Sequence, residues 1–186
     1  MRPVAILFVA EKKWSGKSTA AEHVASRWGD HAEVFHFAEA PYMAADCFTD
    51  PSLHKDETNE LGITKRQICI AISEKLKELH PDLPVLNVRK RILATIAEGR
   101  HVIFDDIRRH EEFHWLRSLG TVDVHVIEIR RPEDGTTEAD SWITDEVREL
   151  WGEDRRVIEN DGTFEFHKRA LEVCNEILYG ETEYED

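Results

Sequence analysis

The stretch from Trp14 to Thr19 carries the residue types that hold phosphate groups in nucleotide-binding proteins. It reads Trp-Ser-Gly-Lys-Ser-Thr and follows an apolar run at residues 4–10. Gly16 would let the backbone approach phosphate oxygens, Lys17 would contact the β- and γ-phosphates, and the Ser18 hydroxyl would hold Mg²⁺. A helix that begins here adds its N–H groups and its dipole. The residues therefore predict a phosphate loop with Lys17 as a catalytic residue.

The loop departs from the full phosphate-loop pattern at its first position. That pattern begins with a glycine, and Glu11 occupies the place here. A glutamate adds negative charge near phosphates and a Cβ atom where a positive φ is often needed. Trp14 either stacks on a base or packs beside the loop. The predicted ATP-binding residues are Lys13, Trp14, Ser15, Gly16, Lys17, Ser18, Thr19 and Asn160.

Two acids end a second apolar segment. Asp105 and Asp106 follow His-Val-Ile-Phe, which is typical of a short buried strand. In phosphate-loop proteins, an acid at the end of such a strand helps to hold magnesium. We expect Ser18, Asp105 and Asp106 to bind Mg²⁺.

Strands and helices are expected to alternate along the chain. The predicted strands are 4–10, 33–38, 101–106, 122–129 and 156–158, and the main predicted helices are 18–28, 64–79, 85–97, 111–119, 144–151 and 163–178. This alternation predicts an α/β fold, a parallel sheet with helices on both faces. A single domain over residues 1–186 is the simplest organisation, with polar stretches near 49–62 and 132–143 as candidate moving parts.

Composition limits the classes of partner. The chain has 186 residues and a formal net charge of −14, which argues against nucleic acid or an anionic membrane as the main partner. No apolar run approaches the ~20 residues that span a bilayer, and we expect a cytosolic protein. Three well-separated cysteines, Cys47, Cys69 and Cys174, suggest buried free thiols rather than a disulfide framework or a zinc site.

Several segments, taken in order, resemble the bacteriophage deoxynucleoside monophosphate (dNMP) kinase family over nearly the whole chain. The most specific are Asp106-x-Arg108 and the turn Ile158-x-Asn160-x-Gly162. The others are residues 14–19, 37–41, 63–67, 112–120 and 140–146. Animal-type phosphomevalonate kinases share much of this layout.

The resemblance implies a three-layer P-loop NTPase fold that transfers the ATP γ-phosphoryl group to the 5′-phosphate of a dNMP. It implies an acceptor-binding helical region near 39–98 and a lid near 132–143. Arg66 matches an acceptor-binding arginine, Asp106 and Arg108 match the acceptor-binding Asp-x-Arg step, and Arg130 and Arg131 precede the lid. Arg108, Arg130 and Arg131 would join Lys17 as catalytic residues. The expected partners are ATP with Mg²⁺ and a small phosphorylated acceptor, in the host cytoplasm if the chain is phage-encoded; a homodimer is possible.

Phosphoryl transfer to a phosphorylated acceptor is also consistent with the residue types alone, without the family resemblance. Two phosphate groups repel each other, so catalysis requires in-line positioning and neutralisation of charge on the transferred group. Arginine suits this task because its planar fork binds phosphate oxygens bidentately. No general base is needed, since a phosphate acceptor is already ionised. Two alternatives stay open: a phosphomevalonate-type kinase, and a non-catalytic nucleotide-binding protein, which Glu11 favours.

Two further motifs compete with this interpretation. His110-Glu111-Glu112-Phe113-His114 fits H-E-x-x-H, a zinc-protease signature that places both histidines on one helix face. No third ligand is evident apart from His125, on a separate predicted strand, so we expect a solvated helix. Asn160-Asp161-Gly162 lacks the lysine of a guanine-reading motif, and we expect a turn near the adenine of ATP.

Overall fold

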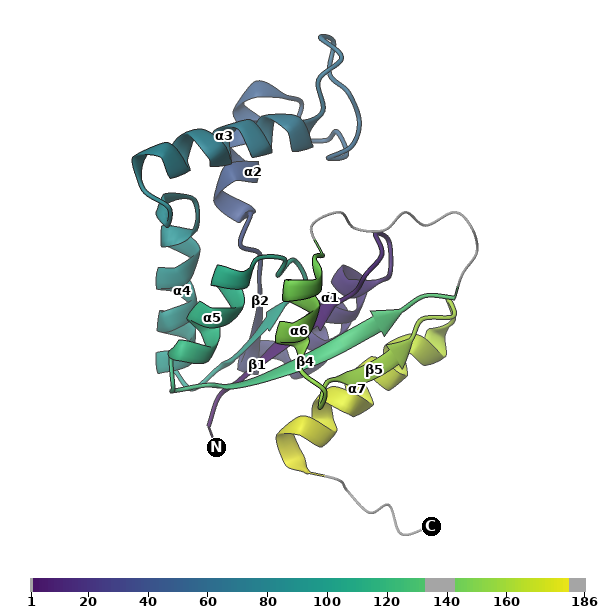
Figure 1. Cartoon of the computed structure of the whole chain (residues 1–186). Coiled ribbons are helices and arrows are strands. Elements are labelled where there is room, and N and C mark those ends of the chain that lie inside the picture. Colours follow the sequence, from purple (N-terminus) through teal and green to yellow (C-terminus); the bar gives the residue numbers. More distant parts are fainter. Residues whose placement is uncertain (1, 133–142, 181–186) are drawn as a thin grey trace. The chain divides into compact units, whose positions relative to one another are not determined.

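A five-stranded parallel sheet organises most of the chain (Figure 1). The computed structural model describes residues 2–132 and 143–180. The strand order is β2-β3-β1-β4-β5. The strands are β1 (Val4–Val9), β2 (Ala32–Phe35), β3 (His101–Phe104), β4 (Asp123–Arg130) and β5 (Arg156–Glu159).

Helices cover both faces of this sheet (Figure 1). On one face α1 (Lys17–Trp28) and α7 (Phe164–Tyr179) lie side by side, and on the other lie α5 (His110–Ser118) and α6 (Asp145–Trp151). The first layer shares a core with the sheet. That core includes Ile6 and Phe8 of β1, Val24 of α1, and Phe166 and Ala170 of α7.

Burial on both faces explains the apolar run at the start of the chain. All six residues of β1 are buried. Ile6 and Phe8 belong to the core beneath α1 and α7, whereas the alternate residues Ala5 and Leu7 point to the opposite face. A strand covered on both sides has no position for a polar side chain, so its sequence does not alternate.

The chain divides into two compact units. Unit 1 comprises Met1–Phe35 and Thr95–Asp186 and contains the whole sheet, and unit 2 is His36–Ala94. Unit 2 contains α2 (Glu39–Ala45), α3 (Lys65–Leu79) and the short 3-10 turns Asp46–Phe48 and Leu83–Val85. The boundary falls inside α4 (Leu86–Ala97). The acceptor-binding role predicted for residues 39–98 stays a prediction.

The predicted α/β fold, with a parallel sheet covered by helices on both faces, is confirmed. Most boundaries fall within one or two residues of expectation. The strand predicted at 33–38 is shorter in the structure. It ends at Phe35, and a helix starts at Glu39. The predicted lid at 132–143 lies almost entirely outside the described residues.

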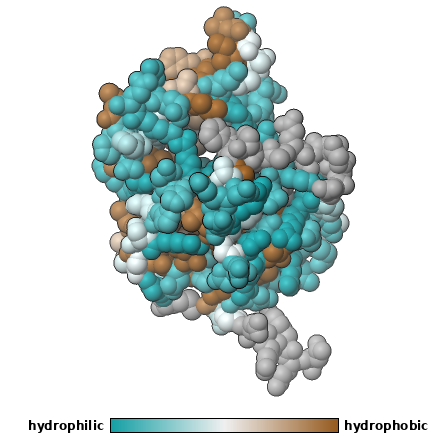
Figure 2. Space-filling model, in the orientation of Figure 1, coloured by the Kyte–Doolittle hydropathy of each residue, from teal (hydrophilic) through white to brown (hydrophobic). Residues whose placement is uncertain are grey.

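Within 2–132 and 143–180, no helix combines the length and apolar character needed to cross a bilayer. Hydrophilic residues dominate the visible face (Figure 2), in line with the net charge of −14.

Candidate active site

The phosphate loop follows the middle strand of the sheet. β1 pairs with β3 on one side and β4 on the other, and residues 10–16 connect it to α1. Leu7 lies opposite Phe104 and Val9 opposite Glu128, so the carboxyl ends of these three strands meet at one edge. In open parallel sheets this edge is where ligands bind.

Gly16 has the backbone conformation that the start of α1 requires. Its φ is 99°, in the left-handed region, and it is the N-cap residue of α1. A Cβ atom at this position would lie 2.4 Å from Asn160 Nδ2 and 3.2 Å from a ring carbon of Phe166. The positive φ and the close contacts of a Cβ atom therefore both favour glycine at this position.

Asn160, directly after β5, is hydrogen-bonded to this loop. Its Nδ2 donates to the Ser15 carbonyl oxygen at 2.7 Å, and its Oδ1 accepts from the Gly162 backbone N–H at 2.9 Å. Its own backbone N–H donates to the Arg130 carbonyl oxygen at 2.7 Å. Asn160 and Ser15 are both buried. The side chain predicted to lie near adenine thus has hydrogen bonds from both ends of its amide to the protein itself, and it fixes the path of the phosphate loop.

Charged and aromatic side chains surround the outer part of the loop. Lys17 Nζ lies 3.4 Å from Ser15 Oγ. Trp14 has a φ of 61°, unusual for a bulky residue, and is 61% exposed. Arg131 Nη1 donates to the Trp14 carbonyl oxygen at 3.0 Å. Trp14 is thus largely exposed beside the loop, and its predicted role in ATP binding stays a prediction.

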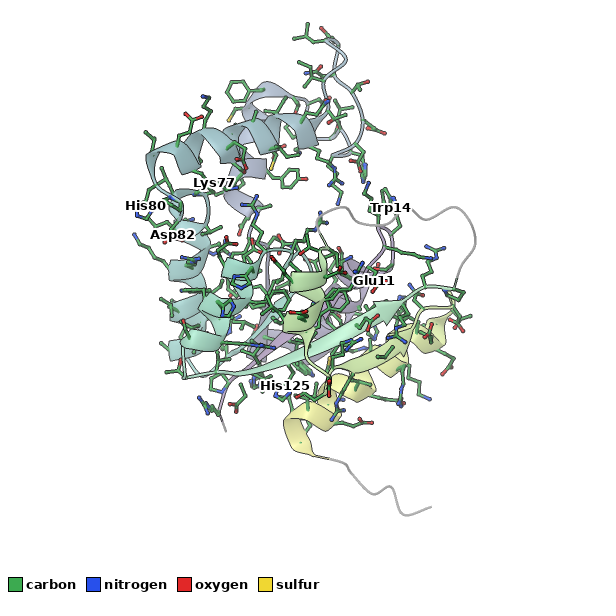
Figure 3. The ribbon with its side chains drawn as sticks, in the orientation of Figure 1. Glu11, Trp14, Lys77, His80, Asp82 and His125 are labelled. Carbon is green, nitrogen blue, oxygen red and sulfur yellow. The ribbon has the colours of Figure 1, made fainter. Side chains whose placement is uncertain are left out.

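Glu11 adopts the first position of the loop without a positive φ. Among the described residues, Trp14 is the one non-glycine residue in the left-handed region, so the expected strain at Glu11 is not found. Glu11 lies in the segment after β1, as Figure 3 shows, and its Oε1 is 3.0 Å from Arg148 Nε. Arg148 also pairs with Asp145, and α6 begins at its cap residue Thr144. Arg148 was not predicted from sequence, because only the fold brings α6 to the phosphate loop.

The two acids after β3 lie in unit 1, with the phosphate loop. Asp105 is 5% exposed and follows Phe104 directly. The backbone N–H groups of Arg108 and Arg109 donate to Glu112 Oε2 at 3.0 and 3.1 Å. The segment between β3 and α5 is thereby held to the first turn of α5. Glu112 was also not singled out by sequence; its signal is an acid three residues into a helix, where capping glutamates occur.

Negative charge is concentrated beside Asp106. Burial, and secondly repulsion by Asp106, raises the pKa of Glu112 to about 7, against the two backbone hydrogen bonds that lower it. Carboxylate and hydroxyl oxygens are the ligands that Mg²⁺ prefers. A divalent cation would relieve this repulsion, and the magnesium-binding role predicted for Ser18, Asp105 and Asp106 stays a prediction.

The arginines at the end of β4 have defined partners. Arg130 Nε and Nη2 donate to the two carboxylate oxygens of Glu128, at 2.8 and 3.0 Å. Arg155 Nε also donates to Glu128, at 2.7 Å. Glu128 is buried, so it anchors Arg130 beside the loop. Arg130 could reach a substrate only if this pair broke, whereas Arg131 already contacts the loop.

Arg66 lies in unit 2 and is described within that unit. It belongs to the first turn of α3, whose cap residue Thr64 shares reciprocal hydrogen bonds with Gln67. Arg66 Nε and Nη2 donate to the two carboxylate oxygens of Asp56 at 2.6 and 3.2 Å. This hydrogen bonding lowers the pKa of Asp56. The acceptor-binding role of Arg66 stays a prediction.

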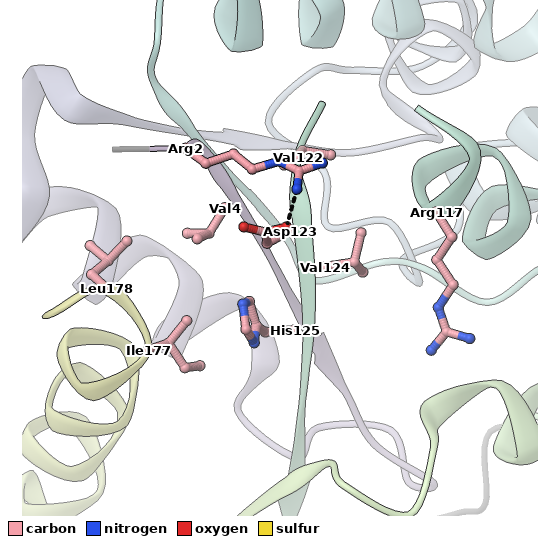
Figure 4. A pocket seen from close by; sticks show the side chains of 9 residues that line it. All are labelled: Arg2, Val4, Arg117, Val122, Asp123, Val124, His125, Ile177 and Leu178. Atoms are coloured by element: carbon pink, nitrogen blue, oxygen red, sulfur yellow. Dashed lines mark ion pairs between the residues drawn. The ribbon is translucent and has the colours of Figure 1, made fainter. Parts of the chain in front are cut away.

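A cavity of about 610 Å³ lies at the opposite end of β4 (Figure 4). Its lining includes Arg2, Asp123 and His125, and Arg2 Nη1 lies 3.0 Å from Asp123 Oδ1. Desolvation lowers the pKa of His125. Asp123 begins β4 and Arg130 ends it, so this cavity is separate from the phosphate loop.

Similarity to known proteins is visible in structure and not in sequence. No family model and no curated protein sequence matches the chain. TT1252 from Thermus thermophilus shares 19% identity over 97% of this chain and 100% of that chain, with a TM-score of 0.52. The Mycobacterium tuberculosis APS kinase CysC shares 12% identity over 95% and 98% of the two chains, with a TM-score of 0.49. The tunicamycin resistance protein of Deinococcus radiodurans shares 16% identity over 95% and 96%, with a TM-score of 0.44. These likenesses concern the fold alone, an α/β fold with a parallel sheet covered by helices on both faces.

Proposed function

We propose that this protein is an ATP-dependent kinase that phosphorylates a small phosphorylated acceptor, a dNMP. The observation that carries the proposal is the fixed loop between β1 and α1. Gly16 takes a positive φ at the N-terminus of α1, and Asn160 holds the preceding Ser15 carbonyl oxygen at 2.7 Å. The N-terminus of α1, with its N–H groups and helix dipole, then lies next to this loop, an arrangement suited to the phosphates of ATP.

The donor half of the reaction uses residues of the loop. Lys17 would contact the terminal phosphates, and Ser18, Asp105 and Asp106 would hold Mg²⁺. When bound, the magnesium ion would neutralise charge on the phosphate oxygens. Lys17 and the fixed backbone would orient the γ-phosphoryl group and stabilise charge that develops on its oxygens.

The acceptor half uses the arginines at the same sheet edge. Arg108 follows β3, in the segment that Glu112 holds through the Arg108 and Arg109 N–H groups. Arg131 contacts the phosphate loop from the end of β4. Guanidinium groups so placed would offset the repulsion between donor and acceptor phosphates, and a phosphate acceptor needs no base to become a nucleophile. Arg66, in unit 2, matches an acceptor-binding arginine by resemblance alone, and its role stays a prediction.

The proposal of a dNMP rests on the sequence resemblance, so the acceptor must be tested directly. ADP release would be followed with dGMP, dTMP, dCMP, dAMP and phosphomevalonate. Turnover with at least one dNMP, and its loss in Lys17→Ala, is the expected outcome. Lys168→Ala, which removes an exposed lysine from α7, is the matched control and should keep turnover. Turnover with phosphomevalonate alone would establish the alternative kinase.

A non-catalytic nucleotide-binding protein is the second candidate, and the Glu11–Arg148 ion pair favours it. Glu11 replaces the first glycine of the phosphate-loop pattern, and its carboxylate is paired with Arg148 at 3.0 Å. Calorimetry would distinguish the two: binding of Mg-ATP without transfer to any of the five acceptors would support this second candidate against the kinase.

A further inference from the structure

Two histidines on the exposed side of α5 bring ring nitrogens close together. His110 Nε2 and His114 Nε2 lie 2.9 Å apart, and the ring centroids are 4.1 Å apart. Residues four apart share one face of a helix, and their side chains lean the same way along it. In the absence of a cation, one ring donates a hydrogen bond to the other. The same two nitrogens could instead turn their lone pairs to one metal ion.

We propose that His110 and His114 form a chelating site for a divalent late transition-metal ion, Cu²⁺ or Ni²⁺ in preference to Zn²⁺. Metal–imidazole bonds are about 2.0–2.1 Å long, so two ligands at a right angle lie roughly 2.9 Å apart, and two at the tetrahedral angle roughly 3.3 Å. The observed separation of 2.9 Å is short enough for both nitrogens to reach one metal ion. Tetragonal geometry with nitrogen ligands is typical of Cu²⁺ and Ni²⁺, whereas protein-bound zinc is usually tetrahedral.

The helix that carries the pair is well anchored. Phe113 and Leu116 of α5 are both 0% exposed. The Glu112 carboxylate accepts the Arg108 and Arg109 N–H groups and ties the first turn to the preceding segment. The backbone that holds His110 and His114 is therefore ordered before a metal arrives, which lowers the entropy lost on binding.

The zinc-protease pattern also needs a third protein ligand. Among residues 2–132 and 143–180, no third histidine, cysteine or carboxylate joins His110 and His114 in a metal-binding group. His125, the third ligand considered from sequence, lines the cavity at the opposite end of β4 (Figure 4). Two protein ligands would leave the other coordination positions to water. Such a site follows the general order of affinity, in which Cu²⁺ binds most tightly among divalent first-row metals.

The charges around the site moderate its affinity. It lies at the N-terminus of α5, where the helix dipole opposes a cation, and the neighbouring Arg109 adds to this effect. The adjacent carboxylate of Glu111 and the net charge of −14 act in the other direction. We expect a micromolar rather than a very tight site. This proposal concerns α5 alone and does not depend on the proposed kinase activity.

Cu²⁺ titration of the whole chain tests the proposal. Calorimetry should give one principal Cu²⁺ site, and the electron paramagnetic resonance spectrum should show coupling to two nitrogens. His110→Ala and His114→Ala should each weaken this site at least about tenfold, because the second ligand of a chelate binds intramolecularly. His80→Ala is the matched control, an exposed histidine after α3 that should not change the titration.

The outcomes are decisive even where a variant is less stable. Circular dichroism checks folding, and His110→Gln with His114→Gln provides a second, polar pair of substitutions at the same exposed positions. Wild-type Cu²⁺ affinity in either set of folded variants would overturn the site. Tighter binding of Zn²⁺ than of Cu²⁺ and Ni²⁺ would overturn its assignment to tetragonal metals.

Discussion

Asn160 Nδ2 donates a hydrogen bond of 2.7 Å to the Ser15 carbonyl oxygen, and so joins the turn after β5 to the phosphate loop after β1. The residues are 145 positions apart in sequence. The bond is buried, and the other end of the amide accepts from the Gly162 N–H. The conformation of the phosphate loop therefore depends on a residue that we expect to act through the loop backbone.

Asn160→Ala should weaken ATP use more than it weakens the fold. It leaves the buried Ser15 carbonyl oxygen without this donor, which costs about 1–3 kcal/mol. We expect the KM for ATP to rise at least about tenfold, the equivalent of 1.4 kcal/mol. Asn175→Ala is the matched control, because Asn175 Oδ1 accepts a comparable bond from Trp28 Nε1 away from the loop. Equal effects of both variants on KM would show that Asn160 acts only through stability.

Gly16→Ala should abolish ATP binding. The new Cβ atom would lie 2.4 Å from Asn160 Nδ2, and alanine rarely adopts a φ of 99°. Gly120→Ala imposes a similar backbone strain, at φ 62°, but meets no atom within 4 Å. Calorimetry with Mg-ATP should therefore show lost binding in Gly16→Ala and retained binding in Gly120→Ala. If the steric clash matters, adding Asn160→Ala to Gly16→Ala should cost less than the sum of the two single changes.

Glu11→Gln should strengthen Mg-ATP binding. It removes a negative charge beside the phosphate site and releases Arg148 from its 3.0 Å ion pair, without changing side-chain size. For a half-exposed carboxylate, we expect roughly a two- to tenfold lower Kd. Glu11→Gly should strengthen Mg-ATP binding by a similar factor. Glu11 does not have a positive φ, so glycine relieves no backbone strain there. Weaker binding in Glu11→Gln would mean that the carboxylate helps ATP, by positioning Arg148.

Glu112→Gln should change how stability depends on pH. The pKa of Glu112 is raised from 4.5 to about 7 in the folded protein, so the folded state binds this proton more tightly than the unfolded state. Between these pH values the wild-type protein should lose stability as pH rises, by about 3 kcal/mol at most. Denaturant unfolding from pH 4.5 to 8 should show that the free energy of unfolding of Glu112→Gln increases relative to that of wild type as pH rises. Glu111→Gln corrects for the general change in charge, and parallel curves for Glu112→Gln and wild type would contradict the prediction.

The sequence predicts features that depend on local pattern. The buried run Val4–Val9 indicates a strand covered on both faces, and Gly16-Lys17 marks the turn into α1. Asp105 and Asp106 are expected at a strand end because an apolar run stops there. Each of these features is encoded within a few residues.

Features that depend on distant contacts could not be predicted. The Glu11–Arg148 pair joins the segment after β1 to α6, and the Asn160–Ser15 bond joins two loops. Their geometry follows from sheet order, which periodicity does not encode. Glu112 lies within a motif that suggested zinc, yet its carboxylate binds backbone N–H groups, because only the packing of α5 decides which glutamate is buried.

Direct transfer of the γ-phosphoryl group is the measurement that tests the central claim most closely. ATP with a radiolabelled γ-phosphate would be incubated with Mg²⁺ and each dNMP, and the nucleotides separated. The account predicts label in the corresponding dNDP with wild-type protein and none with Lys17→Ala. Label that stays in ATP with every dNMP, in a protein that binds Mg-ATP, would contradict it.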